Sequence, residues 1–460
     1  MGKLKQISYT LSSNIVATII SVLVTFIVPK ILGITDYGLF QLYLFYFGYI
    51  GFFHFGWADG FFLRYGGKYY EELNQNLLKT ELIAFSIFQC LVSTVIYSIS
   101  FMNVKVTEKR FIFICIGIVM VFYNIRLFYQ YLLQATERIK EYAITVIIEK
   151  IVYFIVIALL IILGIKNFRY YVVANIIGVI ISLLYAVICC KNVLYAKLCA
   201  ISDLVKEINE NLKVGSKLLL ANIASLLIIG IVRQAIELKW DVEQFGKLSL
   251  SISISNMLVM LINSIAVVLF PMLKRMEVNK IKPLYSKLDN CISSLLYLIM
   301  AFYYPVRVII SAWIPQYAES LLYLAILFPM CIYECEVSLL TTTYLKVLRK
   351  ENIIMYINIT TVILSVFLTG ISVFLLENIT LSIFSLLFLS SFRCIVSQIM
   401  LGKNLSISIK EQIINENLMV LLFIVSNYFI KGVCGMIIYV VAVCSFFILN
   451  KKNIIDSFKF

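Results

Sequence analysis

The chain alternates between long apolar runs and short polar breaks from one end to the other. Most runs are about 20 residues long, which is the length of a helix that crosses the hydrocarbon core of a bilayer. Transmembrane strands would need only about 10 residues with strict alternation, and these runs do not alternate. We therefore predict about fourteen spanning helices, over residues 7–28, 39–62, 82–101, 111–133, 143–165, 170–190, 214–236, 248–273, 291–313, 321–340, 353–376, 381–400, 414–430 and 433–449.

Positive charge is distributed unevenly among the polar breaks. With the N-terminus placed inside, the inner segments hold about 24 Lys and Arg residues and the outer segments about 9. Cytoplasmic loops of membrane proteins collect Lys and Arg. The sequence therefore predicts a multi-pass membrane protein with both termini in the cytoplasm, and only the break at 105–110 opposes this orientation.

Composition supports a membrane protein and excludes several other classes. The chain is 62% hydrophobic and 14% charged, with a mean hydropathy of +0.97, whereas soluble domains are about 45–50% apolar and about 25% charged. The net charge of +14 follows from the short loops, so it does not indicate nucleic acid. The eleven cysteines lack the spacing of a zinc site. We predict no metal, no cofactor and no enzyme, because phosphate-binding Walker and hydrolase motifs are also missing.

Two short patterns recur at a fixed offset. Asn14 precedes Gly38 by 24 positions, and Asn222 precedes Gly246 by 24, so that 208 residues separate the pairs. An even number of predicted spans lies between them, which indicates a parallel repeat of the kind that builds two-lobed transporters.

The repeat leads to a predicted architecture. We expect an all-α, polytopic protein with two six-helix lobes around a central cavity and an additional C-terminal helix pair. The divisions are 1–213 for the first lobe, 214–410 for the second, and 411–460 for the helix pair with a cytoplasmic tail.

Ionisable side chains are rare within the predicted spans, where they are costly and usually face a bundle interior or a watery cavity. The arginines and a lysine are Arg126, Lys150, Arg233, Arg307 and Arg393, with Arg64 at the inner end of the second span. The other groups are His54, Asp59, Glu149, Glu334 and Glu336.

Arginines on separate helices suggest an anion site. A guanidinium matches phosphate oxygens in a bidentate way and resists losing its charge. We therefore take Arg64, Arg126, Arg233, Arg307 and Arg393 as candidates that bind an anion in the cavity. The alternative for each is an arginine that reaches the membrane interface or pairs with a carboxylate.

One such pairing is specific. Arg126 lies eight residues before the end of the fourth span, and Glu149 lies seven after the start of the fifth. At 1.5 Å per residue both are about 10–12 Å from the inner boundary of the membrane. We predict that these antiparallel neighbours form a buried ion pair, because buried charges usually need a partner.

The remaining groups suggest ion coupling or packing. Asp59, Glu149, Glu334 and Glu336 are candidates for binding a proton or Na⁺, and His54 is the only histidine of the chain. A single histidine is more often a hydrogen-bonded packing residue. Gly56 and Gly60 form a small-xxx-small pair that allows another helix to approach closely.

Several degenerate motifs, in this order and spacing, resemble those of the polysaccharide biosynthesis flippases of bacteria. They are "VPKILGITDYGLFQL", "LLQATERIKEYA", "DVEQFGKLSLSISIS", "FPML" and "YYPVRVIISAWIPQYAESLLYLAILFP". These flippases belong to the multidrug/oligosaccharidyl-lipid/polysaccharide exporter superfamily and serve O-antigen and capsule synthesis.

The resemblance implies two lobes that open alternately to each side. It implies movement of an undecaprenyl-diphosphate-linked oligosaccharide across the cytoplasmic membrane, with cationic cavity residues on the diphosphate and a lipid-tail groove at the last helix pair. The implied partners are this glycan lipid, membrane lipids and the glycan polymerase and ligation machinery. A cation-coupled multidrug exporter of the same superfamily is the alternative.

Overall fold

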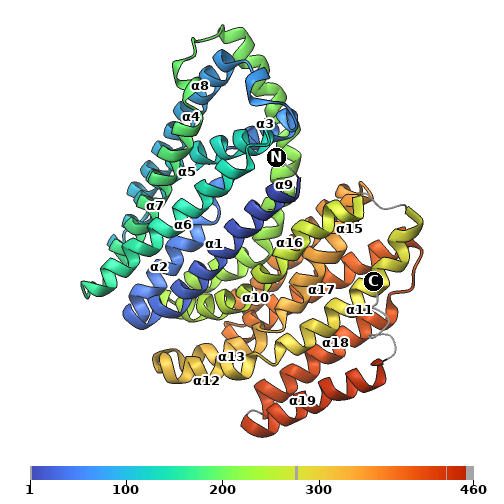
Figure 1. Cartoon of the computed structure of the whole chain (residues 1–460). Coiled ribbons are helices and arrows are strands. Elements are labelled where there is room, and N and C mark those ends of the chain that lie inside the picture. Colours follow the sequence, from blue (N-terminus) through green and yellow to red (C-terminus); the bar gives the residue numbers. More distant parts are fainter. Residues whose placement is uncertain (1–2, 275–277, 431, 452–460) are drawn as a thin grey trace. The chain divides into compact units, whose positions relative to one another are not determined.

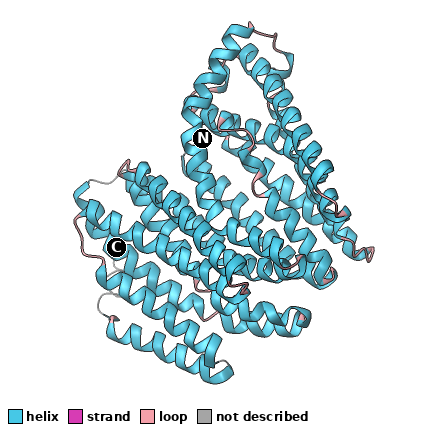
Figure 2. Cartoon of the chain, turned by 180° about the vertical axis from the view of Figure 1, so that it is seen from behind, coloured by secondary structure: helices cyan, strands magenta, loops and turns pink. Residues whose placement is uncertain are grey.

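The computed structural model describes the backbone of residues 3–274, 278–430 and 432–451 (Figure 1). Helices fill this part of the chain, and no strand occurs among the residues described (Figure 2). The all-α prediction is therefore confirmed. The chain divides into two compact units, Met1–Ile223 and Ala224–Phe460, and the boundary falls within the long helix α9.

The first unit is built around the helix α5. This helix packs against α2, α3, α4 and α7, while α6 packs against α1 and α7. The elements are α1 (Lys3–Ile31), α2 (Ile34–Phe47), η1 (Ile50–Phe52), α3 (Trp57–Tyr65), η2 (Tyr70–Glu72), α4 (Gln75–Asn103), α5 (Thr107–Ala135), α6 (Ile139–Ile162), α7 (Phe168–Cys189), α8 (Lys191–Tyr195) and the first part of α9 (Ile201–Lys239).

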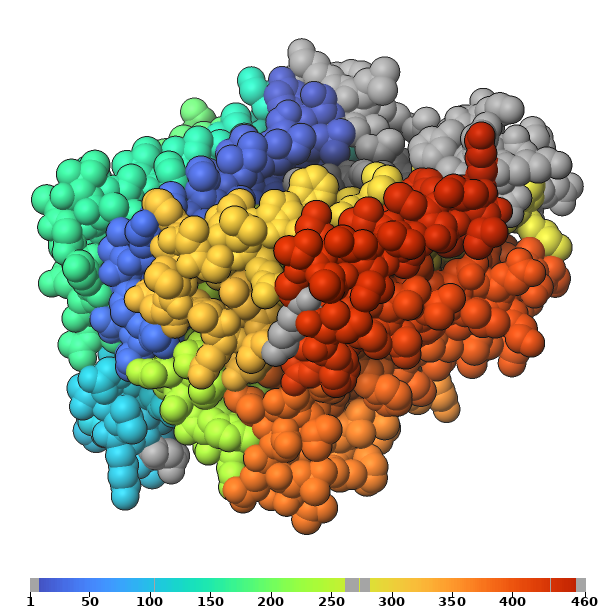
Figure 3. Space-filling view, turned by 90° about the horizontal axis from the view of Figure 1, so that it is seen from below, coloured from blue at the N-terminus to red at the C-terminus, as the bar shows by residue number. Residues whose placement is uncertain are grey.

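The second unit contains three π-helical segments, η4, η5 and η6, in addition to its α-helices. Its C-terminal helices α18 and α19 lie side by side on the face shown in Figure 3. The elements are α10 (Val242–Lys274), α11 (Val278–Met300), α12 (Tyr303–Trp313), η3 (Pro315–Tyr317), α13 (Ala318–Leu327), α14 (Met330–Cys335), η4 (Glu336–Thr341), α15 (Thr342–Val347), α16 (Glu351–Thr369), η5 (Gly370–Leu375), α17 (Ile379–Leu405), α18 (Lys410–Ile424), η6 (Val425–Ile430) and α19 (Gly432–Leu449).

Eleven helices among the described residues are long and apolar enough to cross a membrane, or up to twelve if one bent pair counts as a single span. The bent pair consists of Pro315–Leu327 and Met330–Val347, which meet at 51° beside Pro329. The predicted count of fourteen stays a prediction.

The spanning helices are apolar on their outer faces as well as on their inner faces. On α4, the exposed residues Ile83, Ile87, Leu91 and Val95 recur every four positions. This spacing places them on one face of the helix. A helix that is hydrophobic all round is expected in a membrane, where lipid covers the face that does not pack against protein.

The second predicted span, 39–62, is not one continuous helix. The helix α2 ends at Phe47 and α3 begins at Trp57. Between them, Phe55 and Gly56 have positive φ angles, of 52° and 88°, which an α-helix does not allow. The prediction of an unbroken span was therefore wrong, because hydropathy alone does not show where the backbone turns.

Polar side chains from neighbouring helices support this break. Asn124 of α5 donates a hydrogen bond to the carbonyl of Ile50 at 3.1 Å, and Gln89 of α4 donates to the carbonyl of Phe53 at 3.3 Å. Asn124 also donates to Gln89 at 2.8 Å. Non-helical backbone at membrane depth is tolerated where protein groups satisfy it, and these two buried amides do so.

Candidate functional site

The predicted ion pair between Arg126 and Glu149 is present. Arg126 of α5 is 3% exposed and its Nη1 donates to Oε2 of Glu149 on α6. The other carboxylate oxygen accepts a hydrogen bond from Lys150 Nζ at 3.0 Å. The guanidinium also lies over the ring of Tyr123, 4.9 Å from its centroid. Two cations therefore share one carboxylate, which leaves the group with one net positive charge.

One donor of Arg126 is unused. Its buried Nε–H has no hydrogen-bond partner within the described part of the chain. A buried charged donor without an acceptor is costly. The site therefore has both a positive charge and a donor available for an additional acceptor.

A second buried arginine, Arg393 of α17, lies in the second unit. Its Nη1 lies 3.3 Å from Oε2 of Glu334 on α14, and its Nε donates to Oδ1 of Asn358 on α16 at 3.1 Å. Its Nη2 donates to Oγ of Ser225 on α9 at 2.9 Å. Each nitrogen of this guanidinium thus has an acceptor, and the arginine links four helices of its unit.

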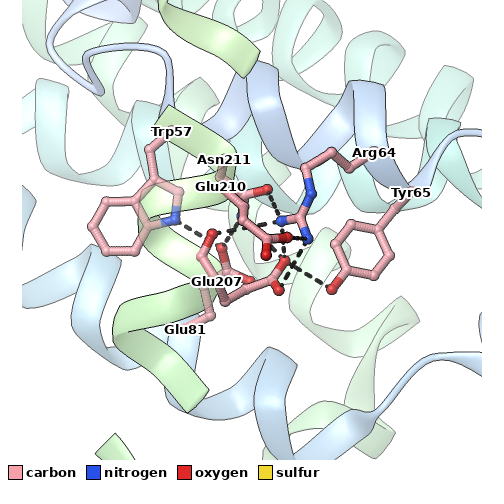
Figure 4. Close-up of polar contacts among 7 residues, drawn as sticks. All are labelled: Trp57, Arg64, Tyr65, Glu81, Glu207, Glu210 and Asn211. Atoms are coloured by element: carbon pink, nitrogen blue, oxygen red, sulfur yellow. Dashed lines mark hydrogen bonds and ion pairs between the residues drawn. The ribbon is translucent and has the colours of Figure 1, made fainter. Parts of the chain in front are cut away.

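Arg64 of α3 lies in an acidic cluster that joins α3, α4 and α9 (Figure 4). Its Nη1 lies 2.5 Å from Oε1 of Glu207, and its Nη2 is paired with Glu210. Asn211 accepts a hydrogen bond from Nη1 at 2.6 Å. Burial lowers the pKa of Arg64, but the hydrogen bond and charge of Glu207 and the charge of Glu210 outweigh it and raise the pKa above its usual range. The arginine therefore stays charged.

The same cluster contains a fully buried carboxylate, Glu81 of α4. Its Oε1 accepts hydrogen bonds from Trp57 Nε1 and from Asn211 Nδ2, both at 2.7 Å (Figure 4). Glu81, Glu207 and Glu210 are not among the residues that the sequence predicted for the site. A signal existed for the last two, because their spacing places them on one face of the helix if the segment before the seventh predicted span is itself helical.

Glycines bring α3 and α9 into contact, as predicted for Gly56 and Gly60. A Cβ added at Gly60 would lie 1.8 Å from the carbonyl oxygen of Asn211. A Cβ added at Gly215 would lie 1.9 Å from the carbonyl oxygen of Gly56. The backbones touch only because side chains are absent, and this close approach places Arg64 beside the acids of α9.

His54 and Asp59 lie close to each other and not beside an arginine. His54 Nε2 lies 3.9 Å from Oδ2 of Asp59. The Nδ1 of His54 accepts a hydrogen bond from the Gly56 N–H at 3.0 Å, and Tyr131 donates to Oδ1 of Asp59 at 3.2 Å. His54 therefore helps to fix the break between α2 and α3.

The last two predicted arginines have different surroundings. Arg233 of α9 donates to Ser249 Oγ at 2.9 Å and lies over the ring of Phe245. Arg307 of α12 is partly exposed. Within each unit, the arginines therefore belong to separate groups of contacts, and the structure shows no single cluster of guanidinium groups among the described residues of either unit.

An apolar groove of about 490 Å³ lies along α17, α18 and η6 in the second unit. Phe384, Phe388, Leu421 and Phe429 contribute to its walls. At one point the wall is polar, where Tyr333 and Ser391 both donate to Oδ1 of Asn417, at 2.9 and 3.1 Å.

Apolar helices of spanning length that bury paired charges define a multi-pass membrane protein. Residues 3–277 match the family model described as "Polysaccharide biosynthesis protein". Because the match covers more than half of the chain, the chain belongs to this family. No curated protein matches the sequence.

Solved structures resemble the chain in fold. "Lipid II flippase MurJ, inward closed conformation" has a TM-score of 0.63 at 13% identity, over 98% of this chain and 100% of that chain. A multidrug resistance MATE family transporter of the MOP superfamily, in its outward-facing conformation, has a TM-score of 0.57 at 12% identity, over 91% and 96%. Its inward-facing counterpart has 0.53 at 10%, over 90% and 95%. The chain therefore shares the fold of these proteins.

Proposed function

We propose that this protein is a flippase that moves undecaprenyl-diphosphate-linked oligosaccharide repeat units across the cytoplasmic membrane, for cell-surface polysaccharide synthesis. The family match and the flippase fold support transport of a lipid-linked substrate. The proposal rests on the surroundings of Arg126. This buried guanidinium shares the single carboxylate of Glu149 with Lys150, so that the group has a net positive charge, and its Nε–H has no partner among the described residues.

The chemistry of the Arg126 group suits a diphosphate. A guanidinium binds phosphate oxygens with two parallel hydrogen bonds. In this structure, Nη1 of Arg126 donates to Glu149. The anion then competes with Glu149 for Arg126, and Lys150 supplies a second cation. Arg126 is 3% exposed, so substrate contact requires another state of an alternating-access cycle.

The other candidates take supporting roles in this proposal. Arg393, Arg233, Arg307 and Arg64 are further candidates for the diphosphate, in states of the cycle in which they leave their present partners. Asp59, Glu149, Glu334, Glu336 and His54 are the candidates for coupling transport to an ion. The apolar groove along α17 and α18 accepts the lipid tail, since its walls are mostly Phe, Leu and Ile. In this proposal both termini lie in the cytoplasm, which the Lys and Arg distribution supports.

Reconstituted transport tests the proposal. Proteoliposomes are loaded with a fluorescent undecaprenyl diphosphate oligosaccharide, and its appearance in the opposite leaflet is measured. We expect Arg126→Ala and Arg393→Ala to lower the rate at least tenfold, while the exposed Arg349→Gln leaves it unchanged. Arg126→Lys separates charge from geometry, since it keeps the cation and loses the bidentate donor. Wild-type rates in both alanine variants refute the proposal.

The alternative function is cation-coupled drug export, which the fold likeness to multidrug transporters favours. The same proteoliposomes distinguish the two functions. Dye efflux driven by a Na⁺ or proton gradient, without translocation of the glycan lipid, identifies an exporter.

A further inference from the structure

Three carboxylates meet in the interior of the second unit. Asp289 comes from α11, Glu336 is the first residue of η4, and Glu416 comes from α18. Each is at most 1% exposed, and one oxygen from each lies within 4.8 Å of the others. We call these residues the acidic triad.

Among the residues that the structure describes, no Lys or Arg pairs with the triad. Arg126, Arg393 and Arg64 each bind a carboxylate, whereas five of the six triad oxygens accept no hydrogen bond in the described structure. These are both oxygens of Asp289, both of Glu336 and Oε1 of Glu416. Three unpaired carboxylates in a protein interior are too costly to persist without protons or a bound cation.

Neutral oxygen groups point into the same place. Gln398 is fully buried, and its Nε2 donates to Oε2 of Glu416 at 2.9 Å while its amide oxygen has no partner. The hydroxyl of Tyr285 is buried and has no hydrogen-bond partner among the described residues. Tyr285 lies four residues before Asp289, on the same face of α11. These two side chains supply further oxygen ligands in addition to the carboxylates.

The geometry and charge favour a hard divalent cation. Three oxygens within 4.8 Å of one another leave a common centre no more than about 2.8 Å from each, close to the Ca²⁺–oxygen distance of about 2.3–2.6 Å. Mg²⁺ usually keeps several waters and is bound by one or two carboxylates, so a buried set of three carboxylates suits it less well. The set has no Cys or His ligand, so it does not suit zinc. A divalent ion also neutralises more of the charge than Na⁺ does.

We infer that Asp289, Glu336 and Glu416 bind one hard divalent cation of the Ca²⁺ class, with Gln398 and Tyr285 completing its shell. The ion connects α11, η4 and α18, and so fixes the C-terminal helix pair to the rest of its unit. This site is separate from the arginine groups assigned to the diphosphate, and it does not depend on the identity of the transported lipid.

Binding to the full-length protein tests the inference. The purified chain is stripped with EDTA and dialysed against radioactive Ca²⁺, and its thermal unfolding is followed during titration with CaCl₂, MgCl₂ or NaCl. We expect one Ca²⁺ per chain and a Tm that rises with CaCl₂. Asp289→Asn and Glu416→Gln should each weaken Ca²⁺ binding at least tenfold. The exposed Glu411→Gln on the same helix as Glu416 should leave it unchanged.

Several outcomes overturn the inference. They are no Ca²⁺ bound to the wild-type chain, Ca²⁺ binding that survives both triad substitutions, and stabilisation by NaCl alone. If Asp289→Asn fails to fold, the wild-type stoichiometry and Glu416→Gln still decide the result. No transport substrate is present in these measurements, so their failure differs from a failure of the flippase proposal.

Discussion

The Arg126–Glu149 pair allows a direct measurement of how much a buried charge partner stabilises this protein. Glu149→Gln removes the carboxylate that both Arg126 and Lys150 contact. Arg126 Nε already lacks a partner, so the guanidinium keeps little beyond the ring of Tyr123. Breaking a buried pair on one side costs about 3–5 kcal/mol. We expect the free energy of unfolding to fall by about this amount.

A double-mutant cycle isolates the pair from other effects of the substitution. Arg126→Met, Glu149→Gln and the double variant are unfolded in detergent micelles by denaturant, and the coupling energy is obtained from the four free energies. The double variant should be more stable than Glu149→Gln alone, because no charge is then left buried without its partner. The exposed pair Lys239–Glu377, whose atoms approach to 2.5 Å, provides the matched control.

The control pair should show a coupling energy of only about 0–1 kcal/mol, because both of its side chains are partly exposed to solvent. A coupling at Arg126–Glu149 no larger than that of the control would refute the reasoning. That result would mean that water or lipid headgroups stabilise the charge of Arg126 in the folded protein as strongly as Glu149 does.

Two further predictions concern the first unit. Gly60→Ala should destabilise the protein by several kcal/mol in the same unfolding assay, because its Cβ would meet the Asn211 carbonyl at 1.8 Å. Gly33→Ala, with nothing within 4 Å, is the control, and equal effects of the two would contradict the packing argument. Asn124→Ala should cost about 1–3 kcal/mol, because it removes the hydrogen bond to the Ile50 carbonyl and leaves Oε1 of the buried Gln89 without its donor, and hydrogen exchange should rise at residues 48–56. Unchanged exchange there would show that the break needs no support from α5.

Sequence reasoning succeeded where a position along a helix was sufficient to find a partner. Arg126 and Glu149 lie at similar depths on consecutive antiparallel helices, so counting residues was enough to pair them. The spacing of Gly56 and Gly60 likewise predicted that another helix packs closely against them. The family followed from ordered motifs along most of the chain.

The same reasoning failed where the partner is distant in sequence or the helix boundary is hidden. Asp289 was placed in a loop, although α11 begins at Val278, so its burial could not be seen. Glu207 was also assigned to a polar loop, whereas α9 begins at Ile201. The hydropathy of a segment does not reveal that it continues as a helix beyond the membrane, nor which distant acid its side chains will meet.

The π-helical segment η4 makes its part of the chain unusually tolerant of a change in length. A π-turn contains one residue more than an α-turn, so deleting one residue within Glu336–Thr341 would leave an α-helical turn of nearly the same rotation. The helix α15 would then keep its angular position, and Tyr344 would still face Tyr285, whose ring it now meets edge-on at 5.2 Å. The same deletion within α14 or α15 would instead rotate every later residue of the helix by about 100°.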